Sequence, residues 1–244
     1  FFVCDFETTV YPGQKMTEVW ATACVELFTE DVDIYNSIWD FYEYIVSLED
    51  NATLYFHNLK FDGAFVIDYL LRVLEYKQAY IPHEGFQKFK DMPNKSFRYS
   101  ISAMGQWYTI TIKINDKKIE IRDSLKLIPF SVKEIGETFG TKHKKLDMEY
   151  TGFRYAGCEI TDKEKEYIAN DVLVVKEALE IMFQEGHTDL TIGSCCLKEF
   201  KFLKGKDDYE MFFPNVYEIN LDKNYFELYH SKGFNAGEYI RKSY

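Results

Sequence analysis

The sequence lacks any apolar run long enough to cross a membrane, and its few cysteines do not form paired motifs. A membrane-spanning helix needs about 18 apolar residues, whereas the apolar stretch 65–74 is interrupted by Asp68 and Arg72. Five Cys is an odd number, and no Cys-x-x-Cys pair occurs, which excludes a small disulfide scaffold. The first residues contain neither a basic start nor a long apolar segment, so we expect no secretory signal and a cytoplasmic location. They also lack an initial Met, which favours a piece of a longer chain.

Basic residues are also scarce, with 29 Lys and Arg against 40 Asp and Glu and a formal net charge of −11. This balance argues against a protein that binds nucleic acid through bulk positive charge. Aromatic residues are abundant, with 19 Tyr, 21 Phe and 3 Trp, and they supply material for a large core. The length of 244 residues suits one large domain with a small appendage.

The spacing of apolar residues predicts strands and helices that alternate along the chain. Strands are expected at 2–4, 19–28 and 53–56, and 108–114 and 118–122 form a predicted hairpin around Asn115–Asp116. Helices are expected at 37–48, 61–76, 131–139 and 161–184, and Thr161 with Glu164 has the form of a capping box. This order predicts an α/β fold in which a mixed sheet is flanked by helices.

A polar, glycine-containing stretch at 204–208 resembles a linker or an exposed loop. We therefore expect a main domain over residues 1–203 and a C-terminal segment over 204–244. The segment is too short to form a second domain alone, and we interpret it as the start of a connection to a missing domain.

Four acidic residues and one tyrosine stand out by position. Asp5 and Glu7 are two apart on a predicted strand, so both side chains point to one face of the sheet. Asp62 lies at the start of a predicted helix, where the alternative is a helix N-cap or a first-turn acid, since the helix dipole favours negative charge there. Tyr167 and Asp171 are four apart on another helix and share a face.

Carboxylate oxygens are the ligands that Mg²⁺ and Mn²⁺ prefer. Two such ions about 4 Å apart can activate a water and stabilise the leaving oxygen in phosphodiester hydrolysis. An Asp-x-Glu pair on a strand is more often solvated surface chemistry, so the order and the local sequence of the whole set carry the interpretation.

Three segments resemble the exonuclease motifs of family B DNA polymerases, and most closely the protein-primed branch of bacteriophages and linear plasmids. These segments are Asp5–Thr9, Tyr55–Gly63 and Tyr167–Asp171. Shorter matches in the same order are Arg122–Leu125 with Pro129–Phe130, Lys145–Asp147, and Gly193–Ser194 with Leu197–Lys198. The resemblance covers roughly residues 1–235. It implies a ribonuclease H-like fold of the DEDD type, which removes nucleotides from a 3′ end and proofreads with two divalent ions.

The resemblance implies roles for particular residues. Asp5, Glu7, Asp62 and Asp171 would hold two Mg²⁺ or Mn²⁺ ions. Tyr167 would orient the attacking water, since its phenol is a neutral donor at working pH. Lys145 would neutralise charge that develops on the phosphate, although a lysine within the basic run 142–145 also fits a solvated loop.

The family's single-strand ligands fall on seven residues of this sequence: Thr8, Tyr55, His57, Asn58, Phe61, Ser124 and Leu125. Aromatic faces stack on bases without reading their sequence, and the hydroxyl and amide groups can donate to phosphate or sugar oxygens. Core packing is the alternative for the two aromatic residues, and a hydrogen-bonded structural histidine is the alternative for His57. Ser124 and Leu125 also match the family's contact with a terminal priming protein.

The match stops before the family's polymerase half. The polymerase motifs are absent, and the linking motif between the two halves is reduced to the final glycine of His230–Gly233. The chain is therefore either a piece of a polymerase or a stand-alone relative, and we favour the piece: a proofreading-type domain that acts on single-stranded DNA 3′ ends beside the polymerase domain of its parent chain. If the source is viral, the compartment would be the cytoplasm of a bacterial host. The alternative is a module that binds DNA or a priming protein without catalysis.

Overall fold

The computed structural model describes residues 1–9, 11, 13–148 and 153–213. The chain divides into two compact units, Phe1–Ile192 and Gly193–Tyr244, which we consider separately. Within the described residues, no helix combines the length and the hydropathy that a membrane span requires. The predicted boundary between a domain 1–203 and a segment 204–244 stays a prediction, and the His230–Gly233 motif lies outside the described residues.

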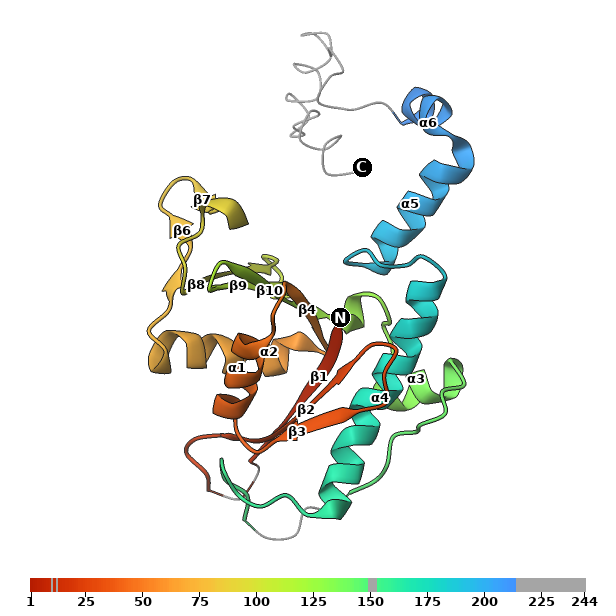
Figure 1. The fold of residues 1–244 in the computed structure, drawn as a ribbon. Helices are drawn as coiled ribbons and strands as arrows, with labels where there is room; N and C mark the ends of the chain where they lie inside the picture. Colours follow the sequence, from red (N-terminus) through yellow and green to blue (C-terminus); the bar gives the residue numbers. More distant parts are fainter. Residues whose placement is uncertain (10, 12, 149–152, 214–244) are drawn as a thin grey trace. The chain divides into compact units, whose positions relative to one another are not determined.

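An eight-stranded mixed sheet forms the centre of the first unit (Figure 1). Its strands, in spatial order, are β3 (Val32–Tyr35), β2 (Val19–Glu26), β1 (Phe2–Thr8), β4 (Ala52–Phe56), β10 (Lys117–Asp123), β9 (Trp107–Ile114), β8 (Ser96–Ile101) and β5 (Lys77–Gln78). The strands β1, β4 and β10 run parallel, so they point their carboxyl ends to one edge of the sheet. β2 and β9 pair antiparallel to the outer members of this trio.

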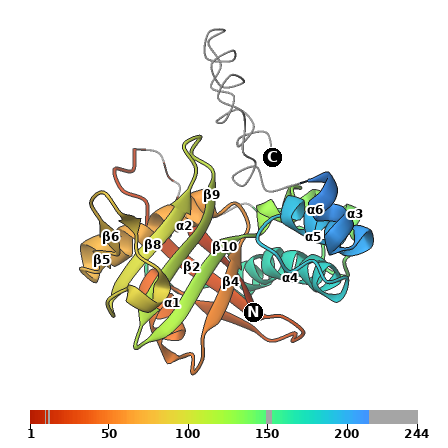
Figure 2. The same ribbon diagram turned by 90° about the horizontal axis from the view of Figure 1, so that it is seen from above.

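Helices cover the sheet, and three of those described begin at a Ser or Thr whose side chain caps them. α1 (Ile38–Ser47) follows the Ser37 cap, and α2 (Leu59–Asp68) follows β4. α3 (Val132–Thr138) and α4 (Asp162–Gln184) both begin with complete capping boxes. Figure 2 views the sheet and the helix α4 from above. The predicted fold class is confirmed, as is the Thr161–Glu164 capping box.

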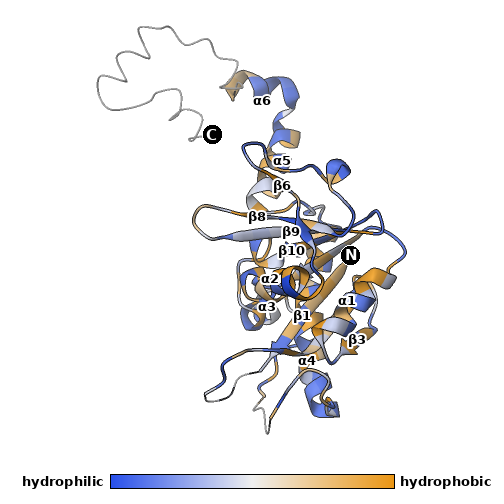
Figure 3. Ribbon diagram, turned by 90° about the vertical axis from the view of Figure 1, so that its left-hand side faces the viewer, coloured by the Kyte–Doolittle hydropathy of each residue, from blue (hydrophilic) through white to orange (hydrophobic). Residues whose placement is uncertain are grey.

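The alternation of β1 separates core side chains from acidic ones. Phe6 packs its ring edge-on against Phe41 of α1 and Phe56 of β4, with centroids 5.1 and 5.0 Å apart. Asp5 and Glu7, on either side of Phe6, point to the opposite face and toward α4. The strand is coloured as hydrophobic in Figure 3 because Phe2, Val3, Cys4 and Phe6 dominate it.

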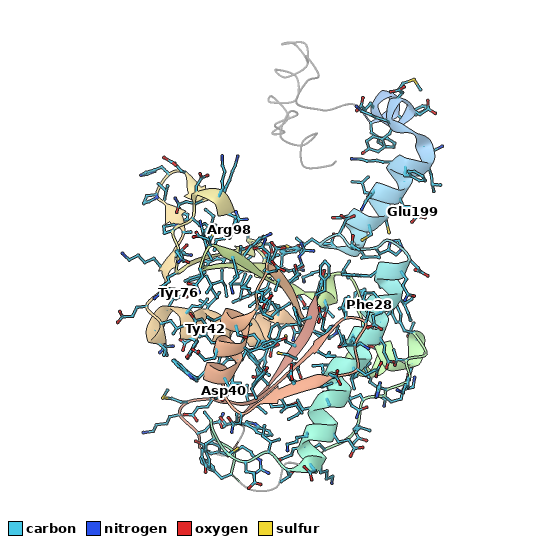
Figure 4. All side chains as sticks on the ribbon, viewed as in Figure 1. Phe28, Asp40, Tyr42, Tyr76, Arg98 and Glu199 are labelled. Carbon is cyan, nitrogen blue, oxygen red and sulfur yellow. The ribbon has the colours of Figure 1, made fainter. Side chains whose placement is uncertain are left out.

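One predicted helix and one predicted strand differ from the structure. The helix expected over 61–76 begins at Leu59 and ends in a π-helical turn, Tyr69–Val73. Tyr76 then lies outside the helix, where its hydroxyl is 2.7 Å from that of Tyr42 (Figure 4). The strand expected over 108–114, whose alternation of Ile with Thr and Lys indicates one exposed face, is buried at both Ile110 (0% exposed) and Thr111 (2% exposed).

In the second unit, α5 (Ile192–Lys204) and α6 (Lys206–Phe212) are separated by Gly205 alone, whose φ of 79° favours glycine. The prediction of a loop over 204–208 is therefore wrong, because most of these residues are helical. The rings of Phe200, Tyr209 and Phe213 contact one another within this unit.

Gly63 of α2 offers a test of the packing between α2 and the sheet. A Cβ atom at this position would lie 2.9 Å from Cζ3 of Trp107 and 3.2 Å from Cδ1 of Ile110. We expect Gly63→Ala to lower the free energy of unfolding by about 1–3 kcal/mol through overpacking, although Ala is the better helix former. Urea denaturation measures the change.

The exposed neighbour Ala64 provides the matched control. Ala64→Gly is expected to cost only about 0.5–1 kcal/mol, the ordinary helix penalty of glycine. Equal stability of the Gly63→Ala variant and the wild type would contradict the close approach of α2 to β9.

Candidate metal centre and single-strand site

Three carboxylates meet on the α4 side of β1. One ligand oxygen from each of Asp5, Glu7 and Asp171 lies within 4.8 Å of the others. The first two come from alternate positions of β1, and the third comes from the middle of α4. The structure thus brings together three of the four acids that the sequence singles out.

Asp62 lies beside this trio, at the beginning of α2. Its side chain is 3% exposed, and the backbone N–H of Phe6 donates to its carboxylate. The charge of Asp62 is also the strongest nearby charge acting on Asp5, so the two carboxylates are neighbours. Among the described residues, the Oδ1 atoms of Asp62 and Asp171 are buried without a hydrogen-bond partner.

Burial and mutual repulsion shift the titration of this cluster. The pKa of Asp5 is raised well above its ordinary value, first by burial and then by the charges of Asp62, Glu7 and Asp171. Burial raises the pKa of Asp62 to about 7. Burial also raises the pKa of Asp171, although the ion pair with Lys145 partly offsets the effect. The cluster holds more negative charge than its protein surroundings neutralise.

Lys145 is the cation that the chain places at the cluster. Its ammonium forms an ion pair with Asp171 and donates a hydrogen bond to the hydroxyl of Tyr167 at 3.3 Å. The same ammonium lies 5.1 Å from the centre of the Tyr167 ring. Burial raises the pKa of Tyr167, which keeps its phenol protonated. The four-residue spacing on α4 therefore brings Tyr167 and Asp171 to one lysine.

Glu177, which the sequence does not single out, holds the loop that carries Lys145. Its carboxylate accepts a hydrogen bond of 2.6 Å from the backbone N–H of Lys142 and lies 2.5 Å from Nδ1 of His143. Lys144 donates to the carbonyl of Gly136 on α3. The contacts of Glu177 join residues 34–35 positions apart in sequence, so no local pattern indicates them.

Asp123 is a second residue whose role the sequence conceals. Its buried Oδ1 accepts from the backbone N–H groups of Asn58 at 3.0 Å, Leu59 at 3.2 Å and Leu125 at 3.1 Å. Asn58 adopts a left-handed conformation with φ of 69° and provides no side-chain cap for α2. A carboxylate from β10 therefore caps the helix that carries Asp62.

His57 is tied into the structure through both ring nitrogens. Nε2 lies 2.7 Å from the carbonyl oxygen of Phe130, which can only accept, so Nε2 carries the proton. Burial lowers the pKa of His57, and its Nδ1 lies 2.9 Å from Oγ of Ser124, whose hydroxyl donates to the carbonyl of Phe56 at 3.1 Å. These contacts match the structural alternative, and a role for His57 as a strand ligand stays a prediction.

The other predicted strand ligands differ in exposure. Tyr55 is 1% exposed and receives a 3.4 Å hydrogen bond from Arg122, and Ser124 is fully buried. Phe61 is 50% exposed, and its ring contacts that of Phe65 with centroids 5.5 Å apart. Asn58 is exposed, whereas Thr8 and Leu125 are half-buried.

A cavity of about 200 Å³ adjoins the cluster. Its lining includes Asp5, Asp171 and Lys145 from the cluster, together with His57 and Val132. Two of the four acids, Lys145 and His57 therefore line one hollow beside β1 and α4.

The raised pKa of Asp62 makes the stability of the metal-free protein depend on pH. Between the ordinary carboxyl pKa of 3.8 and the raised value of about 7, the folded state binds the extra proton. The free energy of unfolding therefore falls as pH rises through this window, by at most about 1.4 kcal/mol per pH unit from this group. We expect the Asp62→Asn variant to show a smaller fall in the free energy of unfolding over this pH range. Urea denaturation at a series of pH values, with a chelator present, measures the difference.

Asp68→Asn, on the exposed face of the same helix, serves as the control and should leave the slope unchanged. An identical pH dependence for the wild type and Asp62→Asn would contradict the burial of an uncompensated carboxylate.

Comparisons with known proteins agree with this architecture. The family model described as DNA polymerase type B, organellar and viral, matches residues 43–158. The DNA polymerase of Bacillus phage B103 is 37% identical over 230 residues, which are 91% of this chain and 37% of that protein. The chain thus spans little more than a third of the length of this relative.

Two solved structures match over most of the chain. Phi29 DNA polymerase complexed with primer-template DNA gives a TM-score of 0.76 at 33% identity, over 94% of this chain and 38% of that one. The same polymerase complexed with single-stranded DNA gives a TM-score of 0.74 at 34% identity, over 86% of this chain and 36% of that one. The chain is thus similar in sequence and in structure to the DNA polymerases of phage phi29 and related phages, and the resemblance is to the N-terminal exonuclease domain of these protein-primed, family B enzymes.

Proposed function

We propose that this chain is a metal-dependent 3′→5′ exonuclease that hydrolyses single-stranded DNA ends and proofreads for a protein-primed DNA polymerase. The observation that carries the proposal is the convergence of Asp5, Glu7 and Asp171 within 4.8 Å, with Asp62 beside them. A structural role alone gives no reason to collect four carboxylates where their charges repel one another.

The donor set fits divalent cations. Two buried carboxylate oxygens, on Asp62 and Asp171, have no hydrogen-bond donor among the described residues, which is costly unless a cation or water satisfies them. Carboxylate oxygens without nitrogen or sulfur ligands suit Mg²⁺ or Mn²⁺. We propose that Asp5, Glu7, Asp62 and Asp171 hold two such ions. When bound, the ions would supply an activated water and stabilise the leaving oxygen.

Lys145 and Tyr167 complete the proposed site. The Lys145 ammonium, held by Asp171, would neutralise negative charge that develops on the phosphate. The Tyr167 phenol, kept protonated by burial, would donate to or orient the attacking water. Glu177 supports the role of Lys145, since it fixes the loop that carries this lysine.

The strand would approach along the loop after β4. Phe61 offers an exposed ring for stacking on a base, and Asn58 offers an exposed amide, both on the turn that Asp123 caps. Thr8 and Leu125 are half-buried at the same edge and could contact the strand. A solved relative is described as complexed with single-stranded DNA, which supports this substrate class.

Further partners follow from the relatives, which are phage polymerases. We propose that this domain adjoins a polymerase domain of the same parent chain, and that the Ser124–Leu125 region contacts a priming protein. The site of action would be the cytoplasm of a bacterial host.

A nuclease assay tests the proposal directly. We expect the chain to shorten a 3′-ended oligonucleotide when Mg²⁺ or Mn²⁺ is added, and to leave a 3′-blocked one intact. Asp5→Ala combined with Glu7→Ala should abolish shortening, because loss of the ligands removes the proposed ions. Gel separation of end-labelled products measures the result.

Asp207→Ala with Asp208→Ala removes the same charge from exposed positions of α6 and should leave digestion unchanged. Persistent digestion by the Asp5 and Glu7 variant would refute the metal assignment. Wild-type cleavage no faster than that variant's would favour a binding module without catalysis.

A further inference from the structure

A small hairpin projects from the end of the sheet opposite to β3 (Figure 1). It consists of β6 (Tyr80–Ile81) and β7 (Gly85–Phe86), in which Tyr80 pairs with Phe86. The hairpin lies between β5 and β8 in sequence, and none of its residues belongs to the acidic cluster or its cavity.

Aromatic rings line this hairpin in a continuous row. The Tyr80 and Phe86 rings lie 5.4 Å apart, and the Phe86 and Tyr99 rings lie 4.9 Å apart. Tyr80 is 51% exposed and Phe86 is 36% exposed. Solvent therefore reaches flat apolar faces that a base could cover.

The segment that contains the hairpin has a net positive charge, whereas the whole chain has a net negative charge. Residues 77–99 contain five Lys and Arg against two Asp and Glu, whereas the chain carries 29 against 40. Four of these lysines are exposed and make no ion pair with the described residues: Lys77, Lys88, Lys90 and Lys95. The positive charge here is free to meet a phosphate backbone.

Hydrogen bonds hold the hairpin in place. The N–H of Ala79 donates to Phe97 of β8 at 2.7 Å, and that of Gln87 donates to Ala79 at 2.9 Å. Arg98, labelled in Figure 4, donates from Nη1 to the carbonyl of Gln87 at 3.0 Å. Lys113 donates to Met92 at 2.9 Å. A preformed surface loses little conformational entropy on binding.

We propose that the basic aromatic hairpin, residues 77–99, binds single-stranded DNA at nucleotides remote from the 3′ end held at the acidic cluster. Exposed rings among unpaired lysines suit a strand, which presents base faces and phosphates together. β8 is four strands from β1, about 19 Å at ordinary strand spacing. The inference rests on the proposed function, because it extends the path of the same substrate.

A binding experiment with metal chelated separates this proposal from catalysis. Fluorescence anisotropy of a labelled 30-nucleotide single strand would be measured over a salt series for the full 244-residue chain and for Lys88→Gln with Lys90→Gln. Loss of two phosphate contacts should lower the slope of log K against log salt by about 1.4. Tyr80→Ala should weaken binding about tenfold, the scale of one lost stacked base.

Lys15→Gln with Lys163→Gln removes two exposed lysines elsewhere and should leave affinity and slope unchanged. Hydrolysis of a trinucleotide should also be equal in all variants, since so short a strand does not reach the hairpin. If both hairpin variants bind the single strand with the same affinity and the same salt dependence as the wild type, the proposal is overturned, even if the nuclease is active. Weakened binding would support it even if no hydrolysis occurs, so the two proposals fail separately. An acidic protein as the true occupant would show itself as unchanged DNA binding, which also counts against the proposal.

Discussion

Repulsion among four carboxylates is the constraint on which the rest of the structure depends. Desolvation raises the pKa of Asp5, Asp62 and Asp171, and like charge adds to the shift of Asp5 and Asp62, so holding these carboxylates together puts the site under electrostatic strain. One lysine, Lys145, offsets part of this strain through Asp171. The remainder is unpaired within the described protein, and divalent cations are the partners that would relieve it. The net charge of −11 therefore does not oppose DNA binding, because bound ions would reverse the local sign.

The fold holds this unfavourable cluster through contacts outside it. Parallel β1, β4 and β10 fix one edge, and Asp123 caps α2 from the end of β10, which sets the position of Asp62. Glu177, on the helix that carries Asp171, fixes the loop of Lys145. Each of the four acids thus sits on a regular element: two on β1, one on α2 and one on α4. Such placement gives the precision that a metal site requires.

Local patterns predicted the features that depend on local chemistry. The period of two on β1 placed Asp5 and Glu7 on one face, and the four-residue spacing on α4 joined Tyr167 to Asp171. Features that depend on distant contacts were not predictable. Asp123 accepts from backbone N–H groups 64–65 positions away, and Glu177 accepts from groups 34–35 positions away. The π-helical turn at Tyr69–Val73 also replaces the expected end of a helix. The hairpin strands β6 and β7, of two residues each, are too short for a periodic signal.

Metal binding is the central claim, and titration calorimetry of the chelator-treated chain with Mn²⁺ tests it most directly. Wild-type protein should bind two ions per chain with release of protons, since the carboxyl groups of raised pKa must ionise to become ligands. A variant with Asp62→Asn and Asp171→Asn should lose at least one ion and most of the proton release. Absence of Mn²⁺ binding by the wild type, or equal binding by the variant, would contradict the account.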